Sequence, residues 1–171
     1  MAIFLLRPNL TISATGWAQT GPDVFEAIAD NNLLTAVEQN DESASMLIGL
    51  GDLPGDANIN YIVSVTPVIN AITNGRANTE VEIELLDEGN NELSGGSVEF
   101  DVGVGEEKSP FTYSIPKSVQ WESVNAMRLR MIPNNLGVNI REVYLKVIYY
   151  EIGNVRMATG EVKITQGKVV I

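Results

Sequence analysis

The segment TEVEIELLDEGNN, residues 79–91, decides the fold because apolar and acidic side chains alternate along its first half. The alternating positions are Val81, Ile83 and Leu85 on one side and Glu80, Glu82 and Glu84 on the other. Successive side chains of a β-strand point to opposite faces, so this period of two predicts a strand with one buried and one solvated face. The turn-forming residues that follow predict a reversal of the chain.

The same alternation recurs beyond residue 58, in segments separated by turn-forming sequences. In SVEFDVGV, residues 97–104, we expect Val98, Phe100, Val102 and Val104 on the buried face. Two further segments with a period of two are NINYIVSVTPV (residues 58–68) and AMRLRMI (residues 126–132). Short strands separated by turns are typical of two stacked antiparallel sheets. The sequence therefore predicts an all-β protein, an antiparallel β-sandwich of jelly-roll or immunoglobulin-like topology.

One segment, NIREVYLKVIYYEI at residues 139–152, is apolar on both sides. A strand of this kind is either central in its sheet or covered on its outer face by a neighbouring subunit or by another part of the chain. The two apolar sides are Val143, Leu145, Val147 and Tyr149, and Ile140, Tyr144, Ile148 and Tyr150.

Residues 1–45 lack this regular alternation and are rich in small and turn-forming residues. We expect them to form an extended N-terminal arm, packed on or reaching beyond a β-sandwich domain of residues 46–171. Within the arm, VFEAIADNN predicts a short helix that opens at Pro22 or Asp23 and stops at Asn31 and Asn32. In SVQWESVNA, residues 118–126, we expect one helical turn at most.

Composition argues against most enzyme and nucleic-acid functions. The chain contains no histidine and no cysteine, which removes Ser-His-Asp and Cys-His triads and the usual zinc ligands. Its net charge of -11 repels phosphate backbones and anionic lipids, which are held chiefly by Lys and Arg. We therefore expect a protein that is not an enzyme and binds neither nucleic acid nor membrane.

The glutamates of the opening segment lie side by side on one strand face. A glycosidase needs two acids that face each other across a cleft, so we interpret Glu80, Glu82 and Glu84 as a solvated outer face. Arg128 and Arg130 are expected on one strand face, where they could pair with these acids or with an acidic partner. In GVGEEKS, residues 103–109, the spacing of a phosphate loop is absent, so no nucleotide site is predicted.

Two loops carry the oxygen ligands that calcium prefers, from Asp52 and Asp56 in one and from Asp87 and Glu88 in the other. The spacing of an EF-hand is missing, and acidic loops that contain glycine are mostly simple turns. We therefore predict no metal and no cofactor. Trp17 and Trp121 could be carbohydrate platforms, but burial in the core or at an interface is the better interpretation.

Several phrases together resemble small sandwich proteins encoded among the virion genes of tailed bacteriophages, particularly those of cyanobacteria and marine bacteria. The resemblance covers residues 3–151, and the final EVKITQGKVVI departs from it. The phrases are FLLRPN, GWAQTG followed by DNN and LLTAV, INYIVSVTPVINAIT, VEIELL, VQWESVNAMRLRMIPNN and VNIREVYLKVIYYE.

The resemblance implies a sandwich fold and a virion structural role without catalytic residues. We expect a capsid cement or decoration protein, made in the host cytoplasm and bound to the major capsid protein on the outer surface of the head. A homotrimer would gain avidity from repeated contacts. Alternative functions are a phage tail, neck or fibre module and a carbohydrate-binding β-sandwich module. The candidate interface residues are Phe4, Leu6, Trp17, Phe25, Tyr144 and Tyr150.

Overall fold

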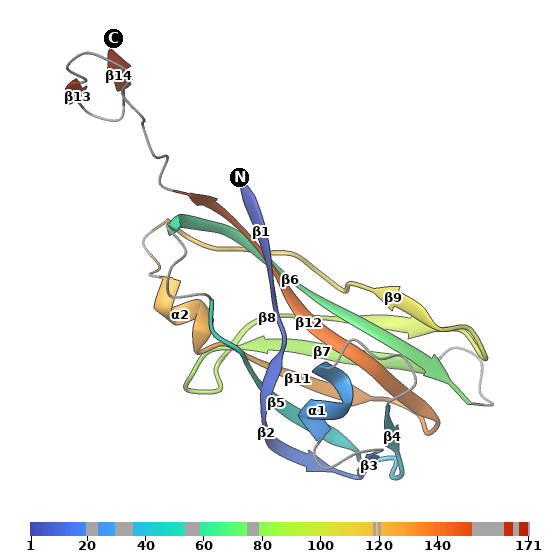
Figure 1. Ribbon diagram of the computed structural model, residues 1–171. Helices are drawn as coiled ribbons and strands as arrows, with labels where there is room; N and C mark the ends of the chain where they lie inside the picture. The colour runs from blue at the N-terminus through green and yellow to red at the C-terminus, as the bar shows by residue number, and fades with distance from the viewer. Residues whose placement is uncertain are drawn as a thin grey trace.

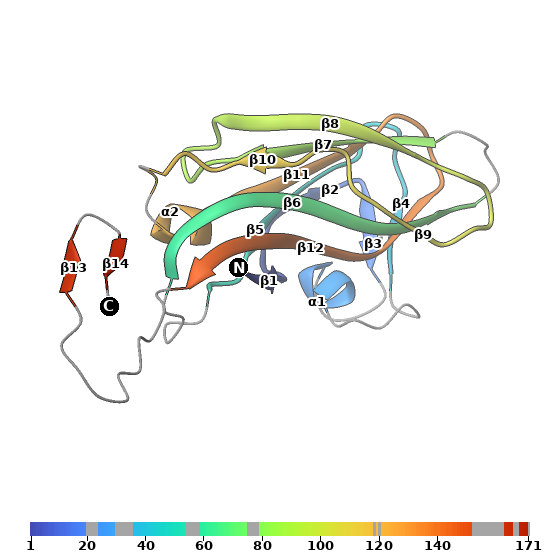
Figure 2. The same cartoon turned by 90° about the horizontal axis from the view of Figure 1, so that it is seen from above.

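Two antiparallel sheets stack face to face as a sandwich, in the computed structural model shown in Figures 1 and 2. This confirms the predicted fold class. Figure 2 shows β6 and β12 side by side in one layer, and β7 and β8 in the other. The structure describes residues 1–19, 24–29, 36–53, 59–74, 79–117, 119, 121–151, 163–165 and 168–170.

Sheet A is built on two long strands, β6 (Ile59–Thr73) and β12 (Val138–Glu151), which pair along nearly their whole length. Shorter strands line both outer edges of this pair, so the strand that is apolar on both sides is central, which is one of the two arrangements predicted for it. The edge of β12 carries β1 (Ala2–Leu6) and β4 (Val37–Gln39), with β3 (Trp17–Gln19) beyond β4; the edge of β6 carries β9 (Glu106–Lys108) and β10 (Tyr113–Ser114).

Sheet B contains the segment that opened the sequence, now β7. Each strand pairs antiparallel with its neighbours. The order across the sheet is β2 (Pro8–Thr15), β5 (Ser45–Leu50), β11 (Arg128–Pro133), β7 (Thr79–Leu86) and β8 (Glu92–Phe100).

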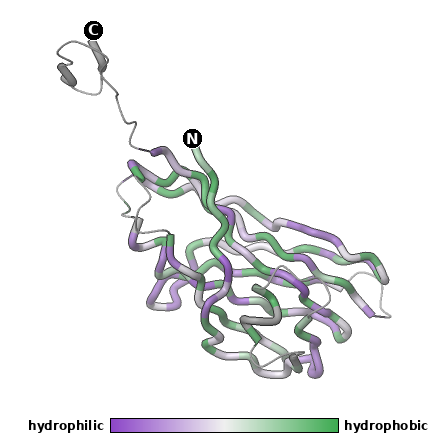
Figure 3. Tube along the Cα trace, in the orientation of Figure 1, coloured by the Kyte–Doolittle hydropathy of each residue, from purple (hydrophilic) through white to green (hydrophobic). Residues whose placement is uncertain are grey.

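The core lies between the sheets and is filled by the predicted apolar positions. Val81, Ile83 and Leu85 are fully buried, and Leu129 and Met131 on the neighbouring β11 are buried beside them. Figure 3 shows hydrophobic and hydrophilic residues alternating along these strands. The period of two in the sequence therefore reports the two faces of each strand correctly.

One predicted strand ends early. β8 stops at Phe100, which is fully buried, whereas Val102 and Val104 are exposed, so their predicted burial is wrong. The partner strand β7 begins at Thr79, which is in register with Phe100, so pairing with β7 ends at Phe100. Val102 instead forms an isolated bridge with Thr73 of β6. The alternation of valines continues in the sequence after the backbone has left the sheet.

The described residues also include two short helices and a separate pair of short strands. α1 (Val24–Ala29) lies within the predicted helix and buries Val24 and Ile28; its predicted boundary residues, Pro22, Asp23, Asn31 and Asn32, lie outside the described residues. α2 (Trp121–Asn125) occupies the second predicted helical segment. β13 (Lys163–Thr165) and β14 (Lys168–Val170) pair with each other. No described helix is long and apolar enough to cross a membrane.

The first 45 residues, predicted as an arm, contribute strands to both sheets. β1 pairs with β12 in sheet A, and β2 pairs with β5 in sheet B. The chain changes sheets at Arg7, whose Nη1 donates to Oε1 of buried Glu142 at 2.6 Å and to the carbonyl of Ala29 at 3.3 Å. The described strands of this region belong to the sandwich itself, because they complete both sheets rather than lie on them.

Candidate functional site

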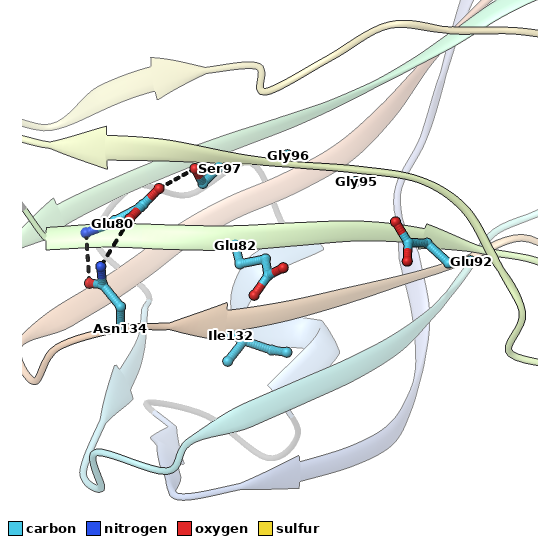
Figure 4. Close-up of a pocket in the computed structure, with 8 residues that line it drawn as sticks. All are labelled: Glu80, Glu82, Glu92, Gly95, Gly96, Ser97, Ile132 and Asn134. Atoms are coloured by element: carbon cyan, nitrogen blue, oxygen red, sulfur yellow. Dashed lines mark hydrogen bonds between the residues drawn. The ribbon is translucent and has the colours of Figure 1, made fainter.

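A groove of about 520 Å³ lies on the outer face of sheet B, where the glutamates of β7 are found. Figure 4 shows Glu80, Glu82 and Glu92 spread along this groove rather than converging on one point. Side chains from β7, β8 and the end of β11 form its walls. The lining residues are Glu80, Glu82, Glu92, Gly95, Gly96, Ser97, Ile132 and Asn134.

The carboxylates of β7 differ in their partners. Glu84 forms an ion pair with Arg130, one of the two pairings expected for the arginines. Glu80 accepts hydrogen bonds from the hydroxyl of Ser97 and from Nδ2 of Asn134, the latter at 3.1 Å. Glu82 has no hydrogen bond or ion pair within the described part of the chain. The three glutamates of β7 therefore form a solvated outer face, on which the Glu82 carboxylate has no side-chain partner among the described residues.

A glycine opens the groove on β8. A Cβ at Gly95 would lie 2.9 Å from Oε1 of Glu92, so the Glu92 carboxylate reaches across the place where a side chain would stand. In the pairing of β7 with β8, Gly95 is in register with Glu84. The groove thus has Glu80 and Glu92 towards its ends and Glu82 between them, and on the β8 side Gly95 and Gly96 leave the backbone uncovered.

The loop acids considered for calcium are only partly brought together. Asp52 and Glu88 line one hollow of about 250 Å³, which Arg128 also lines. Asp87 instead accepts hydrogen bonds from Asn91, whose side chain and backbone N–H groups lower the pKa of Asp87. Asp56 lies outside the described residues. Among the residues that the structure describes, no group of three or more acids could hold a metal ion.

A second surface of interest lies on the outer face of sheet A. We define the sheet A face as Ile3, Leu5, Tyr61, Ile148 and Tyr150. Ile3, Leu5 and Tyr150 are 55%, 40% and 40% exposed, although all are large and apolar. Ile3 is in register with Ile148, and Tyr150 with Tyr61, so these side chains share one side of the sheet. The face is an apolar strip with residues on β1, β12 and β6.

Aromatic and cationic groups border this strip. The rings of Tyr61 and Tyr150 lie 5.0 Å apart with an interplanar angle of 31°. Nζ of Lys117 lies 5.2 Å from the Tyr61 ring centroid, a cation–π contact. Lys146 is in register with Leu5 and extends from the same side of the sheet. The strip is therefore flanked by positive charge, in contrast to the acidic groove of sheet B.

The candidate interface residues divide between the inside and the outside of the sandwich. Leu6 is 1% exposed and packs in the core, so it is not available to a partner. Phe4 and Trp17 are half-buried against the same core. Tyr150 faces outward, whereas Phe25 lies in α1 with its side chain outside the described part, as does that of Trp121. Of the six candidate interface residues, Tyr150 is therefore the one that belongs to the sheet A face.

Tyr144 lies on the outer side of β12, in a more enclosed place. Its ring centroid is 5.8 Å from the guanidinium carbon of Arg7. Burial raises the pKa of Tyr144 to about 12, and a hydrogen bond with Glu107 acts in the same direction. Tyr144 is thus held by neighbours of its own chain and is less available to a partner than Tyr150.

Four residues of the sheet A face were not among the candidates: Ile3, Leu5, Tyr61 and Ile148. The sequence places Ile148 on the second apolar side of its strand, and this pattern could have identified it as a surface residue. In β1 the sequence AIFLL is apolar throughout, so its period of two cannot show which residues face outward.

No protein-family model and no curated protein matches the chain. Among solved structures, the chain is similar to the C-terminal CBM6 of a laminarinase from Zobellia galactanivorans. The TM-score is 0.53 at 9% identity, over 85% of this chain and 98% of that module. The sandwich fold is shared. Of the two predicted topologies, this likeness supports the jelly roll.

Two further structures align over most of the chain. A carbohydrate-binding module from Cellvibrio mixtus lichenase 5A has a TM-score of 0.47 at 10% identity, covering 86% of this chain and 97% of that one. The enzymatically active domain of bacteriophage CBA120 tailspike protein 4 has a TM-score of 0.39 at 13% identity, covering 86% and 19% respectively.

Proposed function

We propose that the chain is a non-enzymatic virion structural protein, a capsid cement or decoration protein that binds the major capsid protein on the outside of a phage head. The sheet A face is the contact surface in this proposal. The observation that carries it is the exposure of Ile3, Leu5 and Tyr150 in one strip. Contiguous exposed apolar surface marks interaction sites, because its burial against a partner is favourable.

The distribution of charge supports this choice of surface. The chain has a net charge of -11, yet the sheet A face is bordered by Lys117 and Lys146. Electrostatic complementarity orients partners more than it adds affinity, so these lysines favour a partner with carboxylates around an apolar centre. The overall negative charge also disfavours a position against packaged DNA and supports one on the outer surface.

Cement activity requires no chemistry in this chain. A protein that binds the assembled shell and not its separated subunits stabilises the shell by mass action. The rigid sandwich would hold the sheet A face in a fixed geometry, so little conformational entropy is lost on binding.

The proposal is tested by Ile148→Asp, with Ile132→Asp as the matched control. Both isoleucines are half-buried and point outward from an inner strand, Ile148 on sheet A and Ile132 on sheet B. We expect Ile148→Asp to weaken cosedimentation with expanded heads about 100-fold, the effect of losing a hot spot worth about 2.7 kcal/mol. Ile132→Asp should bind normally. Equal binding by both folded variants would refute the sheet A face as the contact.

The second candidate function is carbohydrate binding, favoured by the Tyr61 and Tyr150 ring pair on the open sheet A face. Aromatic rings are the usual platforms for sugar, and the similar laminarinase module is a carbohydrate-binding one. The unmodified chain should then bind a sugar on a glycan array, and Tyr150→Ala should abolish this binding. If the unmodified chain shows no glycan signal, this candidate is discarded.

A further inference from the structure

The two sheets differ in how their edges are protected from pairing with other chains. An exposed edge strand offers unpaired N–H and C=O groups, and proteins usually block it with charges, proline, bulges or short length. In sheet B, β8 carries Glu92 and Glu99, and β2 begins at Pro8 and contains two register shifts. In sheet A, β3, β9 and β10 have three residues or fewer.

β1 has none of these devices. Its five residues, AIFLL, contain no charge and no proline, and its register with β12 is continuous from Ala2 to Leu6. Figure 2 shows β12 on one side of β1 and no described strand on the other. The outward side chains Ile3 and Leu5 are 55% and 40% exposed. β1 is thus a regular, uncharged and open edge.

We infer that β1 pairs antiparallel with β1 of a second copy about a two-fold axis, which joins two A sheets into one continuous sheet. Two-fold contacts are self-complementary, so each residue of one copy needs a suitable mate in the other. In the register with the longest overlap, centred on Phe4, Ile3 lies opposite Leu5 of the second copy. The two half-buried Phe4 side chains lie opposite each other on the inner side.

Charge permits this contact in a strongly acidic protein. The outward cation on the part of β12 that pairs with β1 is Lys146, which is in register with Leu5. In the joined sheet the two Lys146 positions are about 16 Å apart, because three strand spacings of about 4.8 Å and two residues of about 3.4 Å separate them. This exceeds the screening length of about 8 Å at physiological ionic strength. The paired segments Ala2–Leu6 carry no charged side chain, so two chains of charge -11 meet there without charged side chains opposed within the pairing.

The pairing of the two β1 strands is short, so the dimer that it forms is weak. α1 follows β1 along the same edge of β12, as the bond from Arg7 to the Ala29 carbonyl shows, so the pairing cannot lengthen beyond Leu6. Five paired residues bury less than the roughly 1,600 Å² of a standard interface. We therefore expect a concentration-dependent dimer rather than the trimer predicted from the sequence. This inference does not depend on the cement role.

The test compares two double variants by analytical ultracentrifugation. Ile3→Lys with Leu5→Lys places lysines opposite each other across the pairing, so the dimer should be lost. Leu10→Lys with Ile12→Lys is the matched control, because these side chains on β2 are 55% and 39% exposed. The unmodified chain and the control should rise towards twice 18.6 kDa with concentration. A monomer at every concentration, or a dimer that persists in the first variant, overturns the inference.

Cysteine cross-linking tests the register and needs no charged variant. The chain has no cysteine of its own. An oxidised mixture of Ile3→Cys and Leu5→Cys chains should form a disulfide-linked dimer, because these residues lie directly opposite, about 5 Å apart. Either variant alone should cross-link poorly, since its diagonal separation of about 7 to 8 Å is too long for a disulfide. Equal cross-linking in all three samples contradicts the pairing.

Discussion

Deletion of residues 1–30 is expected to prevent the chain from folding. The deletion removes β1, β2, β3 and α1, and with them the buried side chains of Leu6, Val24 and Ile28. Burial of each such side chain stabilises the fold by about 1.5 to 3 kcal/mol, and the loss of three is comparable with a typical total stability of about 5 to 15 kcal/mol. We expect the truncated chain to show no cooperative urea transition by circular dichroism.

Removal of residues 163–171 is the control for this truncation. β13 and β14 pair only with each other within the described residues, so both sheets of the sandwich keep their strands. This chain should unfold with an unchanged urea midpoint. A cooperative transition near the native midpoint after deletion of residues 1–30 would instead show that these residues are an arm laid on an independent sandwich.

Arg7→Ala is expected to destabilise the fold by about 2 to 3 kcal/mol, less than the roughly 3 to 5 kcal/mol for breaking a fully buried ion pair, because Arg7 is itself partly exposed. Glu142 is 6% exposed, and the Arg7 guanidinium is its ion-pair partner at 2.6 Å. Loss of the guanidinium leaves a buried carboxylate without that partner and removes a donor from the Ala29 carbonyl. The free energy of unfolding in urea measures the loss.

Two comparisons separate the ion pair from a general effect of removing a long cation. Lys146→Ala, on the outer side of the same β12, should change the free energy of unfolding by less than about 0.5 kcal/mol. Arg7→Met combined with Glu142→Leu should recover most of the loss, because apolar replacement of both partners leaves no buried charge. If the double variant is as unstable as Arg7→Ala, the buried charge is not the cause.

The core strands could be predicted from the sequence because their alternation is strict. Val81, Ile83 and Leu85 are buried where the period of two places them, and the glutamates between them face outward. The prediction failed at Val102 and Val104 because the pattern does not show where the partner strand begins, at Thr79 opposite Phe100. Alternation therefore identifies faces reliably only while the strand continues.

The first 45 residues were harder to interpret for a physical reason. β2 has register shifts between Pro8 and Leu10 and between Thr11 and Ser13, which interrupt its period, and β3 and β4 have only three residues each. Their place in the sheets depends on pairing with distant strands rather than on local pattern. The same holds for the sheet A face, which takes residues from β1, β6 and β12.

The proposed binding through the outer face of sheet A can be observed by electron cryomicroscopy of the virion that carries the chain. We expect density for the sandwich at many positions over the head, with Ile3, Ile148 and Tyr150 turned towards the major capsid protein. Density confined to the tail, or a sandwich on the head with the acidic groove of sheet B against the capsid and the sheet A face open to solvent, would contradict it.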